Sequence, residues 1–129
     1  MTGVQTCALP ISVAPLVDQP LSQVSVTTYL HPATMDDLGY REAWQAAVRP
    51  AATVRMLGSA SIDLSSVATG RLGCFLQSDV NPWDWYPGAA LVVAAGGVAD
   101  TVQVGEHRWG IAGNAQTVAE VRAALLRSL

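Results

Sequence analysis

The stretch that most constrains the fold of this chain runs from Gly58 to Gly97 and contains two helix starts. At the second start, Pro82-Trp83-Asp84 precedes an apolar run over residues 89–95, and Gly96-Gly97 follows it. This pattern predicts a helix with an acidic first turn and a glycine stop. A helix backbone would hold the Asp84 carboxylate rigidly, so that it could offer an oxygen atom to a hard cation such as Mg²⁺.

The first helix start follows Gly58, which predicts a tight turn before a helix that begins at Ser59 or Ser61 and continues to Gly70. Backbone N–H groups and a hydroxyl at such a start can converge on an anion or on a polyol hydroxyl. Serine is also an ordinary N-cap after a glycine turn. The local sequence favours this second interpretation.

The remaining segments alternate between strand and helix patterns. Strands are predicted at residues 24–30, 52–57, 73–77, 98–104 and 107–112, the last two as a hairpin. Thr34 is the predicted N-cap of a helix that stops before Pro50, and a last helix is predicted at about residues 117–127. This order predicts one domain of the α/β class.

The first 12 residues, Met1 to Ser12, look like the translation of a sequencing adapter joined to a gene fragment. The alternative is a signal peptide, because residues 7–17 are apolar, but the first basic residue is Arg41. We therefore expect residues 13–129 to be a truncated α/β domain. Half of the residues are hydrophobic and only 13% are charged, so we expect apolar surface that is covered by a missing N-terminal half or by a second subunit.

Charge and cysteine content exclude several classes of protein. The net charge is −3, with seven arginines and no lysine, so we expect no nucleic-acid partner. No apolar run reaches the roughly 18 residues that span a bilayer, and we expect a cytoplasmic protein with no membrane partner. We expect the Cys74 side chain to be buried, because a free cysteine usually behaves as a small hydrophobic residue. His31 is interpreted as a surface or strand-end residue and His107 as a polar turn residue. The pair Asp36-Asp37 is interpreted as a solvated helix cap.

Several spaced elements together resemble the C-terminal half of the inositol monophosphatase family. They are Gly58-Ser59-Ala60-Ser61, Asp63-Leu64, residues 67–72, Pro82-Trp83-Asp84, Gly88-Ala89 and Ala95-Gly96-Gly97. The agreement in order and separation extends from about residue 24 to about residue 112. The resemblance implies the C-terminal α/β layered domain of the sugar-phosphatase fold, truncated at its N-terminus. It also implies a Mg²⁺-dependent phosphomonoesterase that acts on a small polyol or sugar phosphate.

The resemblance also assigns site residues. One Mg²⁺ would activate the attacking water and a second would stabilise the leaving alkoxide, with Asp84 as a ligand of the second ion. Gly58, Ser59, Ala60 and Gln77 would hold the alcohol side of the substrate. Gln77 and Gly73 stand where the family often has acidic residues, so the resemblance does not define myo-inositol phosphate as the substrate.

The other metal ligands of the family come from an upstream Glu pair and an Asp-Pro-x-Asp-Gly segment, and the sequence contains neither. We therefore expect the chain alone to hold no complete catalytic set and to be inactive, whereas the full-length protein would be a phosphatase. The resemblance also implies a homodimer for the full-length protein, because members of the family are commonly dimers. Two alternatives stay open. One is a histidinol-phosphate, bisphosphate-nucleotide or fructose-bisphosphate phosphatase of the same superfamily, and the other is a non-catalytic α/β assembly module.

Overall fold

The computed structural model describes residues 14–129, and the predicted leader at residues 1–12 lies outside them. The strands are β1 (Ser25–Thr28), β2 (Thr53–Arg55), β3 (Cys74–Ser78), β4 (Val98–Val104) and β5 (His107–Gly113). The helices are η1 (Leu21–Gln23), η2 (Pro32–Asp36), α2 (Leu38–Val48), α3 (Ala60–Ala68), α4 (Pro82–Ala94) and α5 (Ala115–Arg127), where η marks a 3-10 helix. Every predicted strand and helix is present.

The five strands form one mixed sheet in the order β2-β1-β3-β5-β4. β1 is parallel to β2 and β3, whereas β5 is antiparallel to β3 and β4. The carboxyl ends of β1, β2 and β3 therefore meet at one edge of the sheet. The start of β5 lies at the same edge, because Ser78 at the end of β3 pairs with Trp109.

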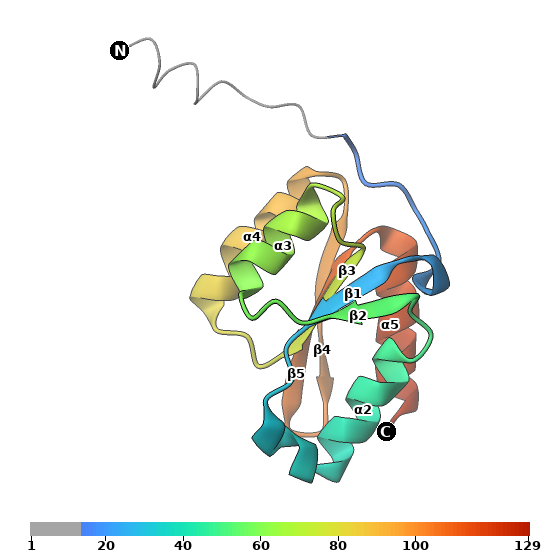
Figure 1. Cartoon of the computed structure of the whole chain (residues 1–129), viewed down its shortest axis with the longest axis vertical. Helices are drawn as coiled ribbons and strands as arrows, with labels where there is room; N and C mark the ends of the chain where they lie inside the picture. The colour runs from blue at the N-terminus through green and yellow to red at the C-terminus, as the bar shows by residue number, and fades with distance from the viewer. Residues whose placement is uncertain (1–13) are drawn as a thin grey trace.

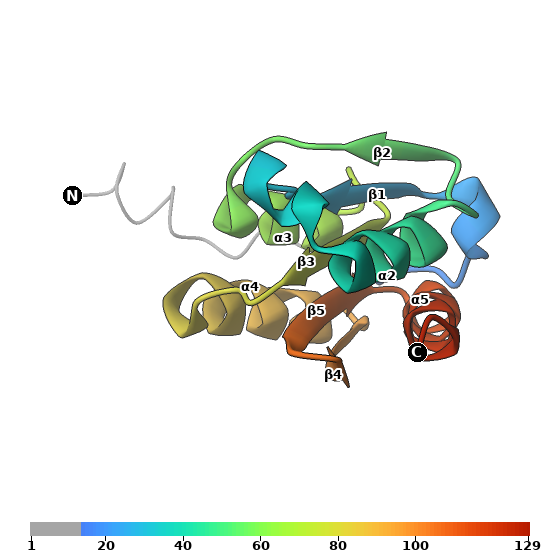
Figure 2. The same ribbon diagram turned by 90° about the horizontal axis from the view of Figure 1, so that it is seen from below.

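Helices cover both faces of the sheet and give three layers (Figures 1 and 2). The steps from β1 to β2 and from β2 to β3 go in opposite directions along the sheet. Right-handed crossovers therefore put α2 and α3 on opposite faces. One core cluster, with Leu76 and Trp109, lies under α2 and α5, and the other, with Phe75 and Val92, lies under α3 and α4. This architecture confirms the predicted α/β fold class.

Two glycines determine how closely α4 packs against its neighbours. A Cβ atom added to Gly88 would lie only 2.5 Å from Leu64 Cβ on α3. A Cβ atom added to Gly110 on β5 would lie 2.9 Å from the ring of Trp85 on α4. Because α3 and α4 both begin at the carboxyl edge of the sheet, they run side by side in the same direction (Figure 1).

The start of α2 differs from the prediction. Thr34 is not its N-cap, because Thr34 lies inside η2, where its hydroxyl donates to the carbonyl oxygen of His31 at 2.6 Å. Asp37 has the extended backbone of an N-cap, and its carboxylate accepts a hydrogen bond from the Tyr40 N–H at 3.0 Å. Aspartate is as good a cap as threonine, and the turn that Pro32 begins moves the helix start by three residues.

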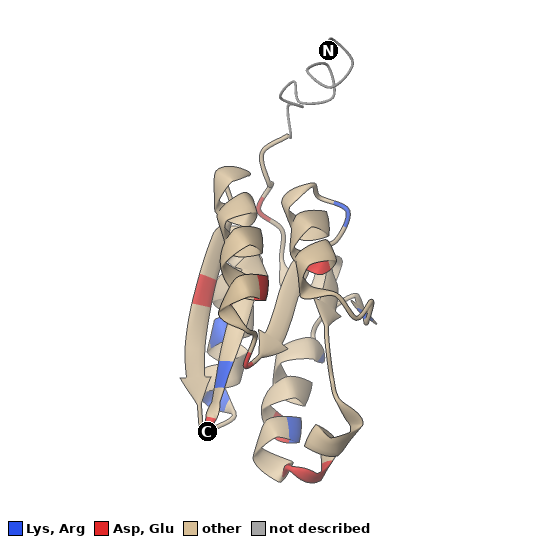
Figure 3. Ribbon diagram, turned by 90° about the vertical axis from the view of Figure 1, so that its left-hand side faces the viewer, with Lys and Arg blue, Asp and Glu red and all other residues tan. Residues whose placement is uncertain are grey.

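The surface carries few charges, and the acidic and basic residues are scattered over the ribbon (Figure 3). The outer face of α4 instead exposes large apolar side chains, with Trp83 72% and Tyr86 61% exposed. Within residues 14–129, no helix combines the length and the apolar character needed to cross a membrane. Cys74 is completely buried, as predicted, and burial raises the pKa of its thiol to about 12.

Candidate functional site

The candidate site is built on the two helix starts at the carboxyl edge of the parallel strands. Gly58 has a φ of +83°, a conformation in which glycine is favoured, and it turns the chain from β2 into α3. The Ser59 hydroxyl accepts a hydrogen bond from the Ile62 N–H at 3.4 Å and caps α3. The ordinary N-cap interpretation of Ser59 is therefore confirmed. The hydroxyl proton is still able to donate a hydrogen bond to a ligand.

Asp84 lies in the first turn of α4, as predicted, and is half-buried. Its position relative to α3 follows from the contact between Gly88 and Leu64. One helical turn, about four residues, before Gly88 is Asp84, and one turn before Leu64 is Ala60. Since the two helices run in the same direction, Asp84 lies on the flank of α4 that faces the start of α3.

Gln77 is on the same side of the sheet as these helix starts. Side chains along β3 alternate between the two faces, and Phe75, two residues earlier, packs under α3 and α4. Gln77 is half-buried and pairs with Gly110 of β5. The sequence-predicted residues Gly58, Ser59, Ala60, Gln77 and Asp84 thus belong to one face and one edge of the fold.

The described residues do not complete a metal site. Within residues 14–129, no three histidine, cysteine, aspartate or glutamate side chains gather as potential ligands. Asp84 contributes one carboxylate, whereas Mg²⁺ binds near-octahedrally and gives up its water ligands reluctantly. The described residues could therefore supply one ligand of a Mg²⁺ site, but not the complete set of ligands.

A buried carboxyl group lies directly below the start of α3. Asp63 is only 1% exposed, and burial raises the pKa of its carboxyl. The Thr27 hydroxyl on β1 lies near enough to offset part of this rise. It does not reach hydrogen-bond geometry, however, and among the described residues Asp63 Oδ1 and Thr27 Oγ1 have no partner. No local sequence pattern indicates this burial, because Asp63 occupies an ordinary first-turn position for an acidic residue.

A second group of polar residues gathers at the same edge, around His107 at the start of β5. Its Nδ1 lies 2.8 Å from Asp79 Oδ2 and its Nε2 lies 3.2 Å from Asp37 Oδ2. His107 is therefore not a simple polar turn residue, whereas the helix cap predicted at the pair Asp36-Asp37 is confirmed at Asp37. No local pattern could have revealed this group, because the three residues are 28 and 70 positions apart.

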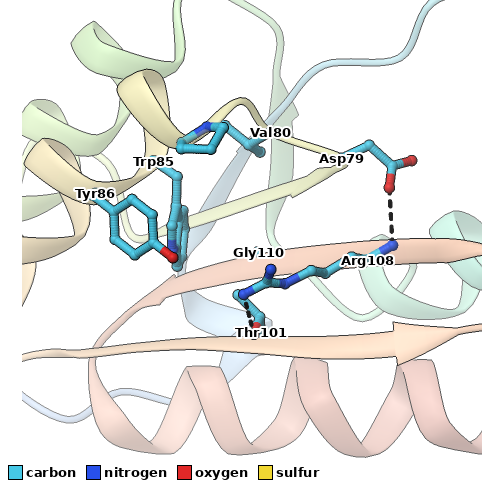
Figure 4. Close-up of a pocket in the computed structure, with 8 residues that line it drawn as sticks. Asp79, Val80, Trp85, Tyr86, Thr101, Arg108 and Gly110 are labelled. Carbon is cyan, nitrogen blue, oxygen red and sulfur yellow. Dashed lines mark hydrogen bonds between the residues drawn. The ribbon is translucent and has the colours of Figure 1, made fainter.

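A small hollow of about 50 Å³ lies between the β3–α4 connection and the β4–β5 hairpin. Figure 4 shows Trp85 and Tyr86 on one side of it and Arg108 on the other. The Arg108 guanidinium donates to the Thr101 hydroxyl at 3.3 Å, and the Arg108 N–H donates to Asp79 Oδ1 at 3.0 Å. No sequence pattern predicts this hollow, because its lining comes from segments that are distant along the chain.

The fold is an α/β sheet that gathers two helix N-termini, a serine and a carboxylate at the carboxyl edge of its parallel strands, the edge at which open α/β sheets commonly bind ligands. Comparison with known proteins narrows the class to one family. The profile of the inositol monophosphatase family matches residues 2–129, and the chain belongs to this family.

Relatives of known name match shorter parts of the chain. A putative Nus factor SuhB from Neisseria meningitidis is 46% identical over 55 residues, which are 43% of this chain and 21% of that protein. Nus factor SuhB from Escherichia coli is 40% identical over 63 residues, which are 49% of this chain and 23% of that protein. An inositol-1-monophosphatase from Caulobacter vibrioides is 38% identical over 56 residues, or 43% of this chain and 22% of that protein.

Solved structures share the fold over almost the whole described chain. The suhB protein from Bartonella henselae superposes with a TM-score of 0.75 at 22% identity, covering 91% of this chain and 46% of that one. SuhB from Mycobacterium tuberculosis gives a TM-score of 0.72 at 26% identity, covering 90% and 46%. The chain therefore spans about half the length of these structures.

Proposed function

We propose that this chain forms the alcohol-binding side of the active site of a Mg²⁺-dependent phosphomonoesterase. Asp84 would be a metal ligand, and Gly58, Ser59, Ala60 and Gln77 would contact the substrate, a small polyol or sugar phosphate. The chain alone would be inactive. The phosphatase would be the complete gene product, in which other segments supply the remaining ligands.

The observation that carries this proposal is the parallel alignment of α3 and α4. The close contact between Gly88 and Leu64 holds the two helices in register, so that Asp84 and Ala60 occupy equivalent first turns. A metal bound by Asp84 would then lie beside the N–H groups and the hydroxyl at the start of α3. This is the juxtaposition that a phosphate ester needs, with its charged group at the metal and its alcohol at neutral donors.

The incomplete donor set supports the second part of the proposal. Asp84 cannot retain Mg²⁺ by itself at ordinary concentrations. The chain also spans only about half the length of its structural relatives. Isothermal titration of this chain with Mg²⁺ should therefore detect no stoichiometric binding, and tight binding would contradict the proposal.

The amide side chain of Gln77 affects which substrate the proposed site would bind. An amide can donate to one hydroxyl and accept from another, but it lacks the negative charge that strengthens such hydrogen bonds. One structural relative, SaIMPase-II, has been solved with inositol monophosphate bound and, separately, with 2'AMP bound. These ligands share a phosphate ester next to hydroxyl groups, and we propose the same substrate class for the complete gene product.

Phosphate release by the complete gene product, assayed with Mg²⁺ over a panel of phosphomonoesters, tests the proposal. The panel should include inositol, sugar, histidinol and nucleotide phosphates. Asp84→Asn should lower kcat/KM by on the order of 100-fold or more, because a metal ligand contributes several kcal/mol. Asp36→Asn is the matched control, since Asp36 is exposed at the end of η2. Unchanged turnover in Asp84→Asn would contradict the assignment.

The SuhB relatives favour a second candidate function. Both the Neisseria meningitidis and the Escherichia coli relatives carry the name Nus factor. The complete gene product would then act as an assembly module, without catalysis. Under this alternative the complete protein would release no phosphate from any member of the panel, and Asp84→Asn would leave its assembly unchanged.

A further inference from the structure

His107 connects three elements that are distant in the sequence. Its ring nitrogens face two carboxylates, Asp79 after β3 and Asp37 at the start of α2, at 2.8 and 3.2 Å. The His107 ring packs against the ring of Tyr40 of α2 in a T-shaped arrangement, with the centroids 5.0 Å apart and the planes perpendicular. The His107 side chain is only 26% exposed, so water competes with these contacts only in part.

The connection from β3 to α4 is strained at Asp79. This residue has a φ of +52°, and it is the one non-glycine residue with positive φ in the described part of the chain. Its N–H donates to the carbonyl oxygen of Arg108 at 2.7 Å. Its Oδ1 accepts from the Arg108 N–H at 3.0 Å, and Figure 4 draws this second bond. Bonds to the β4–β5 hairpin therefore hold Asp79 in this conformation.

The bridge needs two protons on the imidazole ring. A carboxylate only accepts hydrogen bonds, so each ring nitrogen must donate one, whereas a neutral imidazole donates only one. The bond to Asp79 is the largest influence, and together with the bond to Asp37 it outweighs burial and raises the pKa of His107. Two other acidic residues are close in sequence, Asp36 in η2 and Glu106 before β5, and the Arg108 guanidinium is directed to Thr101.

We propose that His107 is a positioning residue that, while its ring carries two protons, ties the start of α2 to the β3–α4 connection and thereby fixes the first turn of α4. The connection begins after Gln77 and Ser78 and leads into the turn that carries Asp84. The positioning role stands on the contacts themselves. Only its consequence for catalysis rests on the proposed function.

The pKa shifts of His107 and Asp37 determine how the bridge between them depends on pH. The pKa of His107 is raised above its ordinary value of 6.5, so the bridge is complete below pH 6.5 and is lost as the pH rises through the raised pKa. The backbone hydrogen bond from Tyr40 and the bond to His107 lower the pKa of Asp37 below 3.8. This side of the bridge is therefore present above pH 3.8 and is lost as the pH falls through the lowered pKa.

NMR titration of this chain gives the first test. The chain has two histidines, and His31→Gln assigns the resonance of His107. The titration midpoint of His107 should fall in Asp79→Asn and in Asp37→Asn. Both replacements remove the charge but keep the local backbone, because asparagine tolerates positive φ and caps helices as well as aspartate. A midpoint that stays unchanged in both variants would overturn the bridge.

Amide hydrogen exchange gives the second test. The N–H groups of Asp79, Asp84 and Arg108 donate to Arg108 O, Asn81 O and Asp79 Oδ1, respectively. In His107→Gln their protection factors should fall about tenfold relative to those of α5, and wild type should lose protection likewise as the pH rises through the His107 midpoint. His31→Gln is the control and should show neither change. Equal loss over the whole chain, or no loss at these amides, would overturn the positioning role.

These measurements need neither Mg²⁺ nor turnover, so they decide the inference even if the phosphatase proposal fails. If that proposal holds, His107→Gln in the complete gene product should remove the alkaline loss of kcat/KM from the pH profile. An unchanged profile would overturn the catalytic consequence and leave the NMR results to decide the positioning role.

Discussion

Replacing Gly88 with alanine should separate α3 from α4 and destabilise the fold. The added Cβ atom would lie 2.5 Å from Leu64 Cβ and 2.5 Å from Leu64 Cδ1. The Cδ1 atom can rotate away, but Cβ is fixed to the backbone, so the helices themselves must move apart. Overpacking of this kind costs about 1–3 kcal/mol, and we take the upper value because backbone must shift. Alanine in place of glycine recovers about 1 kcal/mol of helix propensity, which leaves a net loss of about 2 kcal/mol.

Urea unfolding measures this loss, and Gly39→Ala is the matched control. Gly39 also lies in a helix, but its added Cβ would be 3.5 Å from Asp37 Oδ1, which is an ordinary contact. Gly39→Ala should therefore gain up to about 1 kcal/mol. The free energy of unfolding typically falls by about 1–3 kcal/mol per molar urea. The urea midpoints of Gly88→Ala and Gly39→Ala should therefore differ by about 1 M or more. If Gly88→Ala is as stable as Gly39→Ala, the close packing of α3 and α4 is refuted.

Three further predictions use the same unfolding assay or a thiol assay. Ser59→Ala should cost about 0.5–1 kcal/mol, at the low end for an N-cap because the bond is long, whereas Ser59→Asn should be nearly neutral. With Cys7 replaced by serine, a thiol reagent at pH 8 should leave Cys74 unmodified until urea unfolds the chain, because its pKa is about 12 in the folded state. Rapid modification without urea would contradict its burial. Asp63→Asn should stabilise the chain as the pH rises above 3.8, because burial raises the pKa of this carboxyl and so penalises its ionised form. An equal loss of stability at all pH values would show that the carboxyl instead makes a hydrogen bond that asparagine cannot replace.

Local chemistry in the sequence determined the helices and strands, whereas the resemblance to the inositol monophosphatase family assigned most residues of the candidate site. A glycine with positive φ, a serine cap and a proline in the first turn act within a few residues of one another, so Gly58, Ser59 and the start of α4 could be predicted. Alternation of apolar residues predicted the strand at residues 24–30, and short segments between turn residues predicted the other four strands. The one misplaced helix start, at Thr34 instead of Asp37, arose where two good caps lie three residues apart and only the intervening turn selects between them.

The tertiary structure alone decided which of these elements meet. The contact between Gly88 and Leu64 aligns Asp84 with Ala60, and it joins residues whose sequence patterns are independent. The burial of Asp63 and the bridge from His107 to Asp37 and Asp79 depend likewise on groups that are far apart along the chain. Hydrogen bonds and desolvation act over a few ångströms in space, whatever the separation in sequence, and so the ionisation of these side chains follows from the packing of the sheet and its helices.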